Sequence, residues 1–554
     1  MAHFRTMPIP LSAEQVVDGG AAVAPLTPIY IQESAARRTV RASVVAALTL
    51  GLKIGGNFII IPLTLKYLGR EQYGMWIILQ CIATYLTMSE IGVGQTLMNY
   101  QNVAFVKGDH TTVNRLLATG FGVCSLIVIP LWLAFTVVLA FFPVSNWLLK
   151  DASGHAAFLF SAYLWLAGTL TLIRVPLHVF PSTLLGLREV SLRNVFEFVT
   201  AFFMLGGTIL TLMLHGKLLA LILVLNLGWI ALMISCYPLV HSRHETIRFE
   251  RRFLTPSLMW PLFANSSFFF LYNVGLLFQR LAGNLLAGKL ASLGEVPEIF
   301  VLITLFRVVG WGMADIGSQT LLPYMITFPT RGRWDRVVFF SKLCTKLTFA
   351  LALSYTAFVW VYADLGLRLW LGPGMFLGYG PLACLGGAFL IDVLFLSTNN
   401  FMRGHNCHRQ LAMAMATYAL LSLFLGLVGA KWWMPAKPLL GLCAGLLLAS
   451  VVAQGLPLPW LTYKWLRIGG RKFVDHFLLR PALLVVSAAA VIVLFKAGVN
   501  TPLSQRILAS LTLTMLLPLV TWFAVLGKDE RHWIGEQIDR LKRAGVASLA
   551  QNLP

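Results

Sequence analysis

Apolar stretches of about twenty residues recur along the chain from Thr39 onward, and short polar or charged connections separate them. Twenty apolar residues are about what an α-helix needs to cross the hydrocarbon core of a bilayer. The pattern therefore predicts an all-α fold, a polytopic transmembrane bundle of about fourteen helices. We expect these helices near residues 40–65, 74–99, 116–142, 157–185, 195–214, 218–240, 258–286, 298–325, 337–362, 376–402, 411–430, 438–463, 481–498 and 506–526.

The composition of the 554 residues excludes a water-soluble fold. Hydrophobic residues make up 58% of the chain and charged residues only 12%, whereas soluble proteins carry about 25% charged residues. No CxxC pair occurs, and we interpret the cysteines as packing residues. The polar cluster at 405–408, HNCH, is interpreted as a short basic connection between helices rather than a metal site. The sequence therefore predicts neither a metal nor a cofactor.

The 43 Lys and Arg residues are distributed unevenly among the connections. Segments 241–256 and 464–480 are strongly basic, whereas 215–217 is short and nearly uncharged. With the N-terminus inside, about 28 basic residues fall on the cytoplasmic side and about 10 on the other side, as the positive-inside rule requires. We therefore expect both termini in the cytoplasm. Because the membrane accounts for the net charge of +21, we expect no nucleic-acid partner.

The sequence contains an internal repeat. Residues 90–100, EIGVGQTLMNY, are similar to residues 315–324, DIGSQTLLPY, at an offset of 225 residues that shortens by one after a deletion. In the same register, Leu68-Gly69 matches Leu293-Gly294. Six predicted spans separate the matched helices, and an even number preserves the direction of crossing. The repeat therefore predicts two parallel lobes with a substrate path between them.

The repeat also predicts how the chain is divided into parts. We expect a mobile cytoplasmic tail at 1–38, an N-lobe of helices 1–6 at 39–257, a C-lobe of helices 7–12 at 258–465, two further helices at 466–527 and a cytoplasmic tail at 528–554. The two further helices look like a lateral addition to the lobes.

Among the basic residues within the predicted spans, where a charged side chain costs about 2.5–3.5 kcal/mol on insertion scales, four are candidates for a functional role. They are Lys53, Arg174, Arg280 and Arg307. The repeat places Lys53 and Arg280 within half a turn of each other's symmetry-related position. Because a water-filled cavity that receives an anion removes most of this cost, we interpret all four as substrate-binding residues. As alternatives, Arg280 could snorkel to the outer surface, and Arg174 could pair with an acidic neighbour.

Among the acidic residues of the spans, Glu90, Asp315 and Asp392 are candidates for coupling transport to an ion or a proton, and Glu197 lies near a helix end. Burial disfavours a charged carboxylate, so that such a group can take up a proton. Glu90 and Asp315 occupy equivalent positions of the repeat. Their alternative role is structural, either capping a helix break at Gly92 or Gly317 or pairing with a buried arginine.

Several motifs resemble a known family. Residues 62–74, PLTLKYLGREQYG, are similar to the loop after the first helix of polysaccharide flippases of the O-antigen, Wzx type. Glu90-Ile91-Gly92 and the loop Lys107-Gly108-Asp109 also fit that pattern. These flippases belong to the multidrug/oligosaccharidyl-lipid/polysaccharide (MOP) exporter superfamily. The resemblance covers roughly residues 40–465 by topology, and its specific motifs lie in the first hundred or so residues.

The resemblance implies a flippase that moves undecaprenyl-diphosphate-linked oligosaccharides across the bacterial inner membrane, for exopolysaccharide or O-antigen assembly. It implies two six-helix lobes, alternating access, and a cationic lumen lined by the helices that here carry Lys53, Arg280 and Arg307. Besides membrane lipids, the partners that it implies are a polysaccharide polymerase and a chain-length regulator.

Other functions are also compatible with the sequence. A lipid II flippase would bind the same diphosphate, whereas a multidrug or cation antiporter of the same superfamily would need an acidic site. A membrane polymerase or ligase is less favoured, because the predicted exterior loops are short and no DxD, GxSxG, HExxH or P-loop motif occurs. The sequence therefore favours a transporter over an enzyme.

Overall fold

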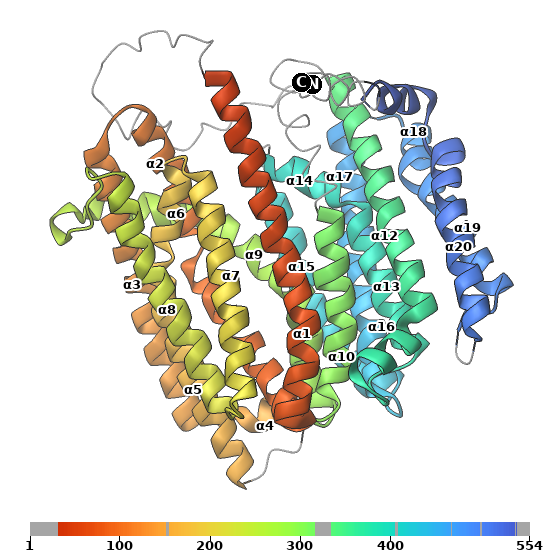
Figure 1. Cartoon of the computed structure of the whole chain (residues 1–554), viewed down its shortest axis with the longest axis horizontal. Coiled ribbons are helices and arrows are strands. Elements are labelled where there is room, and N and C mark those ends of the chain that lie inside the picture. Colours follow the sequence, from red (N-terminus) through yellow and green to blue (C-terminus); the bar gives the residue numbers. More distant parts are fainter. Residues whose placement is uncertain are drawn as a thin grey trace, which may run out of the picture. The chain divides into compact units, whose positions relative to one another are not determined.

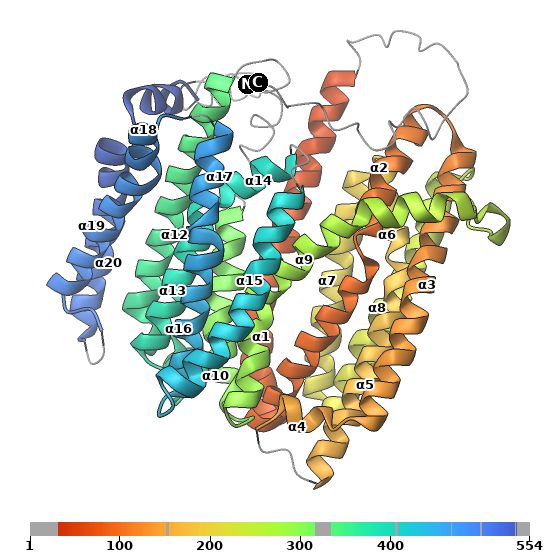
Figure 2. The same cartoon turned by 180° about the vertical axis from the view of Figure 1, so that it is seen from behind.

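The computed structural model describes residues 31–150, 154–315, 334–404, 408–466, 468–498, 501–537 and 539 (Figures 1 and 2). Over these ranges the chain forms helices joined by turns and short connections, and no strand occurs in them. The predicted all-α, polytopic fold class is confirmed. Parts of four predictions lie outside the described residues, namely 1–30 of the N-terminal tail, 316–324 of the second repeat, 405–407 of the polar cluster, and 538 and 540–554 of the C-terminal tail.

Eleven helices in the described part of the chain are long and apolar enough to cross a membrane. The first of them, Leu48–Val106, has 59 residues, well beyond the roughly 20 residues of one crossing. It contains the predicted span 74–99 and residues 48–65 of the predicted span 40–65. Gly69 separates them, because its φ of 78° lies outside the helical range and marks a kink between two helices of α1. Figure 2 shows that α1 turns back along itself.

Contacts between residues divide the chain into two compact units, the first of which comprises Met1–Val274 and Ser292–Gly294. Its described elements are α1 (Ile31–Thr87), η1 (Met88–Glu90), α2 (Val93–Val106), α3 (His110–Phe141), α4 (Val144–Leu148), α5 (Gly154–Leu177), α6 (Val179–Gly186), α7 (Val190–Met213), α8 (Leu218–Arg243) and η2 (Arg251–Phe253). In this unit α7 packs along α1, α6 packs against α2, and α5 contacts α1, α3 and α8 (Figure 1). Buried apolar side chains such as Leu97, Leu117 and Phe180 form its core.

The second unit comprises Gly275–Ala291 and Glu295–Pro554. Its described elements are α10 (Val296–Thr304), η3 (Leu305–Gly310), α12 (Trp334–Leu371), α13 (Tyr379–Leu394), α14 (Leu396–Gly404), α15 (His408–Val428), η4 (Gly429–Trp433), α16 (Pro438–Ser450), η5 (Val451–Gly455), α17 (Pro457–Leu466), α18 (Gly470–Val474), η6 (Asp475–Leu479), α19 (Arg480–Leu494), α20 (Leu503–Val520) and η7 (Thr521–Val525). The division between the units falls within α9 (Pro256–Leu290), at Val274 and Gly275. The predicted lobe boundary, after residue 257, lies in the first turn of the same helix.

Two predicted spans of the second unit are interrupted. The span 376–402 is divided at Phe395 into α13 and α14. The span 298–325 begins as α10 and continues through the π-helical turns of η3, and its described part ends at Asp315. Local widening of a helix changes the direction of the side chains that follow, so hydropathy alone does not place them.

Helices α15 and α16 of the second unit meet at glycines. A Cβ on Gly441 would lie 2.1 Å from the Gly429 carbonyl oxygen, and a Cβ on Gly445 would lie 2.1 Å from the Leu425 carbonyl oxygen. Small residues four positions apart allow helix backbones to touch, which is a common packing mode between membrane helices. The two helices are therefore in direct backbone contact.

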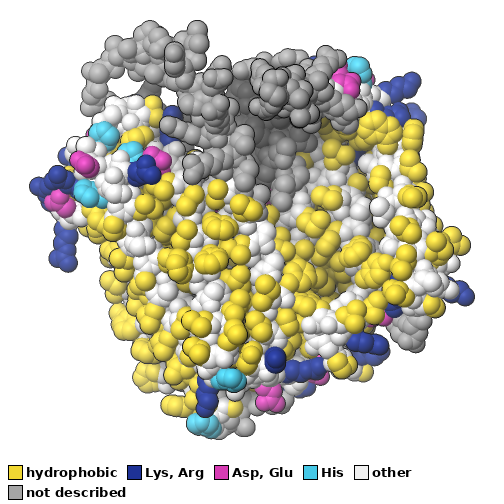
Figure 3. All heavy atoms as spheres, in the orientation of Figure 1, with side chains coloured by type: hydrophobic (Ala, Val, Ile, Leu, Met, Phe, Trp, Pro, Cys, Tyr) yellow, Lys and Arg dark blue, Asp and Glu magenta, His cyan; other side chains and the backbone are white. Residues whose placement is uncertain are grey.

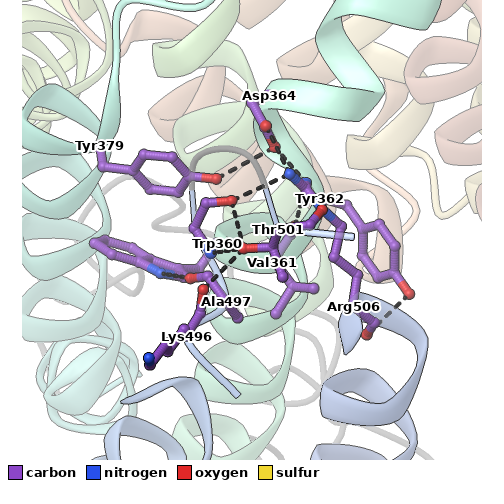
Figure 4. A network of polar contacts seen from close by, with 10 residues as sticks. Trp360, Val361, Tyr362, Asp364, Tyr379, Lys496, Ala497, Thr501 and Arg506 are labelled. Carbon is purple, nitrogen blue, oxygen red and sulfur yellow. Dashed lines mark hydrogen bonds and ion pairs between the residues drawn. The ribbon is translucent and has the colours of Figure 1, made fainter. Parts of the chain in front are cut away.

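The last two long helices, α19 and α20, pack against α12 of the same unit, and buried polar groups join α12 to α20 and to the segment that follows η7 (Figure 4). Arg506 of α20 forms an ion pair with Asp364, in which Nη2 donates to Oδ2 at 2.8 Å, and its Nη1 donates to the Val361 carbonyl at 2.8 Å. Near the start of α12, buried Lys346 donates to both carboxylate oxygens of Glu530 at 2.7 and 2.9 Å. Apolar side chains of the three helices pack between these two ion pairs.

The outer surfaces of the long helices are apolar in their middle parts, and charged side chains gather near the helix ends (Figure 3). Leu126, Phe202 and Met515 are examples of exposed hydrophobic side chains on these helices. An apolar band bounded by charged residues is what a helix bundle presents to the acyl chains of a bilayer. The chain is therefore a multi-pass membrane protein.

Candidate functional site

A cavity of about 480 Å³ lies within the first unit, mainly between α1, α7 and α8. Its lining residues recur at helical spacing, so that one face of each helix is turned toward it. They are Leu52, Lys53, Gly56, Asn57 and Ile60 on α1, Arg193, Phe196, Glu197, Thr200, Ala201, Met204, Leu205 and Thr208 on α7, Leu225, Trp229 and Met233 on α8, and His178 at the junction of α5 and α6.

The charged groups of this cavity are linked to each other. The Glu197 carboxylate accepts from Arg193 Nη2 at 2.7 Å, one helical turn away, and lies 3.6 Å from Lys53 Nζ. The Lys53 side chain is 56% exposed, whereas that of Arg193 is 14% exposed. Two cations and one carboxylate therefore line the cavity, and Lys53 is the more accessible cation.

His178 connects this cavity to Glu90. Its Nδ1 lies 3.1 Å from Glu90 Oε2, while the other oxygen of Glu90 accepts from the Gly94 backbone N–H at 2.9 Å. Glu90 is the last residue of η1, which follows α1, and the left-handed residues Ile91 and Gly92 separate it from α2. Glu90 thus satisfies a free backbone N–H at the start of α2, which is the capping role considered above, and it also holds an imidazole.

Arg174 lies next to the cavity on α5. Its guanidinium is placed over the ring of Trp229, 4.7 Å from the ring centre, and its Nη1 donates to Asn226 Oδ1 at 3.3 Å. The hydroxyl of Thr171 donates to the same oxygen at 3.3 Å. Since Trp229 lines the cavity, Arg174 reaches its wall through an aromatic ring and an amide rather than through an acidic side chain.

In the second unit, Arg307 and Asp392 are partners of each other. They form an ion pair in which the Arg307 side chain is 4% exposed and Asp392 is fully buried. Arg307 Nη2 also donates to the Tyr418 hydroxyl at 3.3 Å. A residue predicted to bind substrate and a residue predicted to couple to an ion are thus joined in the interior. In this conformation neither is available to a ligand.

Arg280 and Asp315 occupy separate positions in the second unit. Arg280 is exposed and lies over the ring of Trp311, 5.8 Å from its centre. Asp315 is half-buried and is the last described residue of its helix. Lys53, Arg174 and Glu90 therefore adjoin one cavity in the first unit, while Arg280, Arg307, Asp315 and Asp392 belong to the second unit.

Sequence reasoning did not identify His178, Arg193 and Asn226 as site residues. His178 carried a usable signal, because it is an ionisable residue within an apolar span directly after Pro176 and Leu177. Arg193 lies before the helix that the sequence predicts from residue 195, whereas α7 begins at Val190. The predicted helix therefore does not show the i,i+4 relation of Arg193 to Glu197. Asn226 gives no such signal, because a single amide in an apolar helix does not indicate its partner.

No protein-family model and no curated protein sequence matches the chain. Among solved structures, the lipid II flippase MurJ in an inward closed conformation has a TM-score of 0.62 at 12% sequence identity, covering 87% of this chain and 99% of that chain. A multidrug resistance MATE family transporter of the MOP superfamily, in an inward-facing conformation, has a TM-score of 0.61 at 11% identity, covering 78% and 99%.

A MOP superfamily transporter from Pyrococcus furiosus, for which a binding pocket of reverse polarity is described, has a TM-score of 0.54 at 13% identity, covering 78% of this chain and 97% of that chain. Identities this low show similarity of fold. The chain therefore has the polytopic helical fold of MurJ and of the MATE transporters of the MOP superfamily.

Proposed function

We propose that the chain is a flippase for undecaprenyl-diphosphate-linked oligosaccharides in the bacterial inner membrane, with both termini in the cytoplasm. Such lipids would be moved by alternating access for exopolysaccharide or O-antigen assembly. The fold supports a transporter, because MurJ is a lipid II flippase and the MATE proteins are multidrug transporters. The 62–74 motif supports the polysaccharide class.

The cavity of the first unit is the observation that carries the proposal. A diphosphate is a compact anion with several charges, and it needs fixed cations to replace its water when it enters a membrane. Lys53 offers a mobile point charge and Arg193 a planar fork of donors, on two neighbouring helices that both line the cavity. Arg174 adds a third cation at the wall, through Trp229.

The buried pair of Arg307 and Asp392 has a different role in this proposal. Its charges compensate each other, so it contributes no net charge that would attract an anion. We assign substrate contact to Lys53 and the adjacent cations of the first unit, with Arg280 as the exposed candidate of the second unit. Glu90 remains the proposed coupling residue, because its carboxylate contacts the imidazole that lines the cavity.

The proposal is tested by reconstituting the purified protein into vesicles that contain a fluorescent polyprenyl-diphosphate oligosaccharide. Movement is measured as the decrease in the fraction of labelled lipid that a membrane-impermeant quencher cannot reach. Lys53→Ala should slow movement at least about tenfold, because a cation that meets the diphosphate is lost. Lys66→Ala is the matched control: this exposed lysine lies on the same helix, over Tyr67, outside the cavity lining.

Equal rates for Lys53→Ala and the unmodified protein would contradict the proposal. A lipid II flippase is the second candidate, favoured by the similarity to MurJ over 87% of this chain. Offering lipid II and an O-antigen-type oligosaccharide in parallel separates the two, since their diphosphates are the same and their glycans differ. Movement of an organic cation instead of either lipid would indicate an antiporter.

A further inference from the structure

The Glu197 carboxylate lies between the two cations of the cavity, where an anionic ligand would have to bind. It accepts from Arg193 at 2.7 Å and lies 3.6 Å from Lys53 Nζ. We propose that Glu197 is an internal counter-ion, which neutralises this cation pair and is displaced from Lys53 by the phosphate groups of an incoming ligand. This inference rests on the proposed function and identifies the residue that sets the affinity of its site.

The two contacts of Glu197 differ in a way that makes displacement feasible. The contact to Arg193 has the length of a charge-assisted hydrogen bond, and the arginine is 14% exposed. The contact to Lys53 is longer than such a bond, and both side chains are partly exposed, at 56% and 38%. Lys53 can therefore leave Glu197 by rotating its flexible side chain, while Glu197 stays on Arg193.

Exchange of one anion for another avoids a large energetic cost. Two cations without a counter-charge in a membrane cavity would be poorly solvated, and they would bind an anion tightly and release it slowly. With Glu197 present, the cations keep a partner before the diphosphate arrives and after it leaves. A diphosphate carries more negative charge than one carboxylate, so it competes successfully for Lys53.

An ordinary structural ion pair is the alternative role. Pairs four residues apart on a helix surface contribute about 0.3–0.5 kcal/mol and need no function. Glu197, however, also faces a cation from a different helix, and all three groups line the same cavity. The structural role predicts that removing the charge of Glu197 changes stability alone, whereas the counter-ion role predicts that it raises the affinity for anions.

The test uses the full-length protein in lipid nanodiscs, with farnesyl diphosphate as the anionic probe and farnesol as the uncharged probe, by titration calorimetry. Glu197→Gln keeps the size of the side chain and removes its charge. We expect the Kd for farnesyl diphosphate to fall about two- to fivefold, the factor that corresponds to a partly exposed ion pair of up to about 1 kcal/mol. The affinity for farnesol should not change.

Glu250→Gln is the matched control, because Glu250 pairs with Arg252 at 2.7 Å in an exposed connection outside the cavity lining. It removes the same charge and should leave both affinities unchanged. If Glu197→Gln does not fold, Glu197→Asp replaces it: the shorter side chain retracts from Lys53, and the Kd for the diphosphate should again fall. An unchanged or increased Kd in the variant of Glu197 overturns the counter-ion role.

Lys53→Ala separates this inference from the proposed function. If Lys53→Ala weakens diphosphate binding and the Glu197 variant does not strengthen it, the cavity binds anions and only the counter-ion role is wrong. If Lys53→Ala leaves diphosphate binding unchanged, the cavity is not the anion site, and both proposals are wrong.

Discussion

Charged side chains inside the helices differ in their partners, and the partner decides what each side chain can do. Lys53 has a partly exposed partner in Glu197, whereas Arg307 has a fully buried partner in Asp392. The first arrangement can exchange partners with a ligand. The second is a closed pair, whose disruption leaves an unpaired charge in the interior.

Asp392→Asn is predicted to destabilise the protein strongly. The substitution leaves the Arg307 guanidinium buried without a counter-charge, which costs about 3–5 kcal/mol. The expected result is a lower melting temperature in detergent, measured by loss of intrinsic fluorescence. Asp335→Asn is the control, because Asp335 is 71% exposed and lies 3.9 Å from Arg336. A melting temperature for Asp392→Asn equal to that of this control would show that the buried pair is not an ion pair.

Glu90→Gln is predicted to change how transport depends on an ion gradient. The variant can still accept from Gly94, so the start of α2 stays capped, but it loses the charge that faces His178. In vesicles with an imposed pH gradient, lipid movement by the variant should no longer respond to the gradient. Glu71→Gln, an exposed carboxylate on α1, should behave as the unmodified protein does. If lipid movement by Glu90→Gln responds to the pH gradient as movement by the unmodified protein does, the Glu90 carboxylate has the capping role alone.

At the scale of the elements, two ion pairs that lie far apart along α12 attach the C-terminal part of the chain to it. Arg506 of α20 pairs with Asp364, which is 13% exposed, and Glu530, in the segment after η7, pairs with the fully buried Lys346. Apolar side chains of α12, α19 and α20 pack between the two pairs. The sequence predicted a lateral pair of helices at 466–527 but not its attachment. The contacts join residues 142 and 184 positions apart, and hydropathy carries no information on such pairs.

Arg506→Ala is predicted to loosen this attachment at one end. Asp364 would lose its cation, and the carbonyl groups of Val361 and Thr501 would lose a donor that Figure 4 shows between them. Limited proteolysis should cut the connection between α19 and α20 at least about tenfold faster than in the unmodified protein. Arg368→Ala, which changes an exposed arginine on α12, serves as the control. Equal cleavage rates would mean that packing alone holds the two helices.

Most of the helices could be predicted from the sequence. Spans of twenty apolar residues coincide with long helices, because the bilayer imposes the same length on each. The interruptions within helices were harder to predict. Gly69 interrupts α1 through a positive φ, and α13 ends at Phe395 within an apolar stretch. The sequence singles out Lys53, Arg174 and Glu90, which adjoin one cavity. It does not single out His178 and Arg193, because their place in the cavity lining depends on how the helices pack.

At the scale of the whole molecule, the distribution of basic residues predicts the orientation in the membrane. The connection 241–256 should lie in the cytoplasm and the turn before α8 should lie outside. In a background without the native cysteines, Lys217→Cys should react with a membrane-impermeant maleimide in spheroplasts, and Arg251→Cys only after lysis. Both positions are exposed, so accessibility to the reagent depends on the side of the membrane. The reverse labelling pattern would invert the proposed topology.

The glycine contact between α15 and α16 limits how the second unit can move. With Gly429, Gly441 and Gly445 at the contact, no side chain lies between the two backbones that could change rotamer to absorb a shift. In the proposed transport cycle, α15 and α16 would move together as one rigid body. Bending or sliding would be confined to helix contacts made by longer side chains. One added methyl group at any of the three glycines would push the two backbones apart.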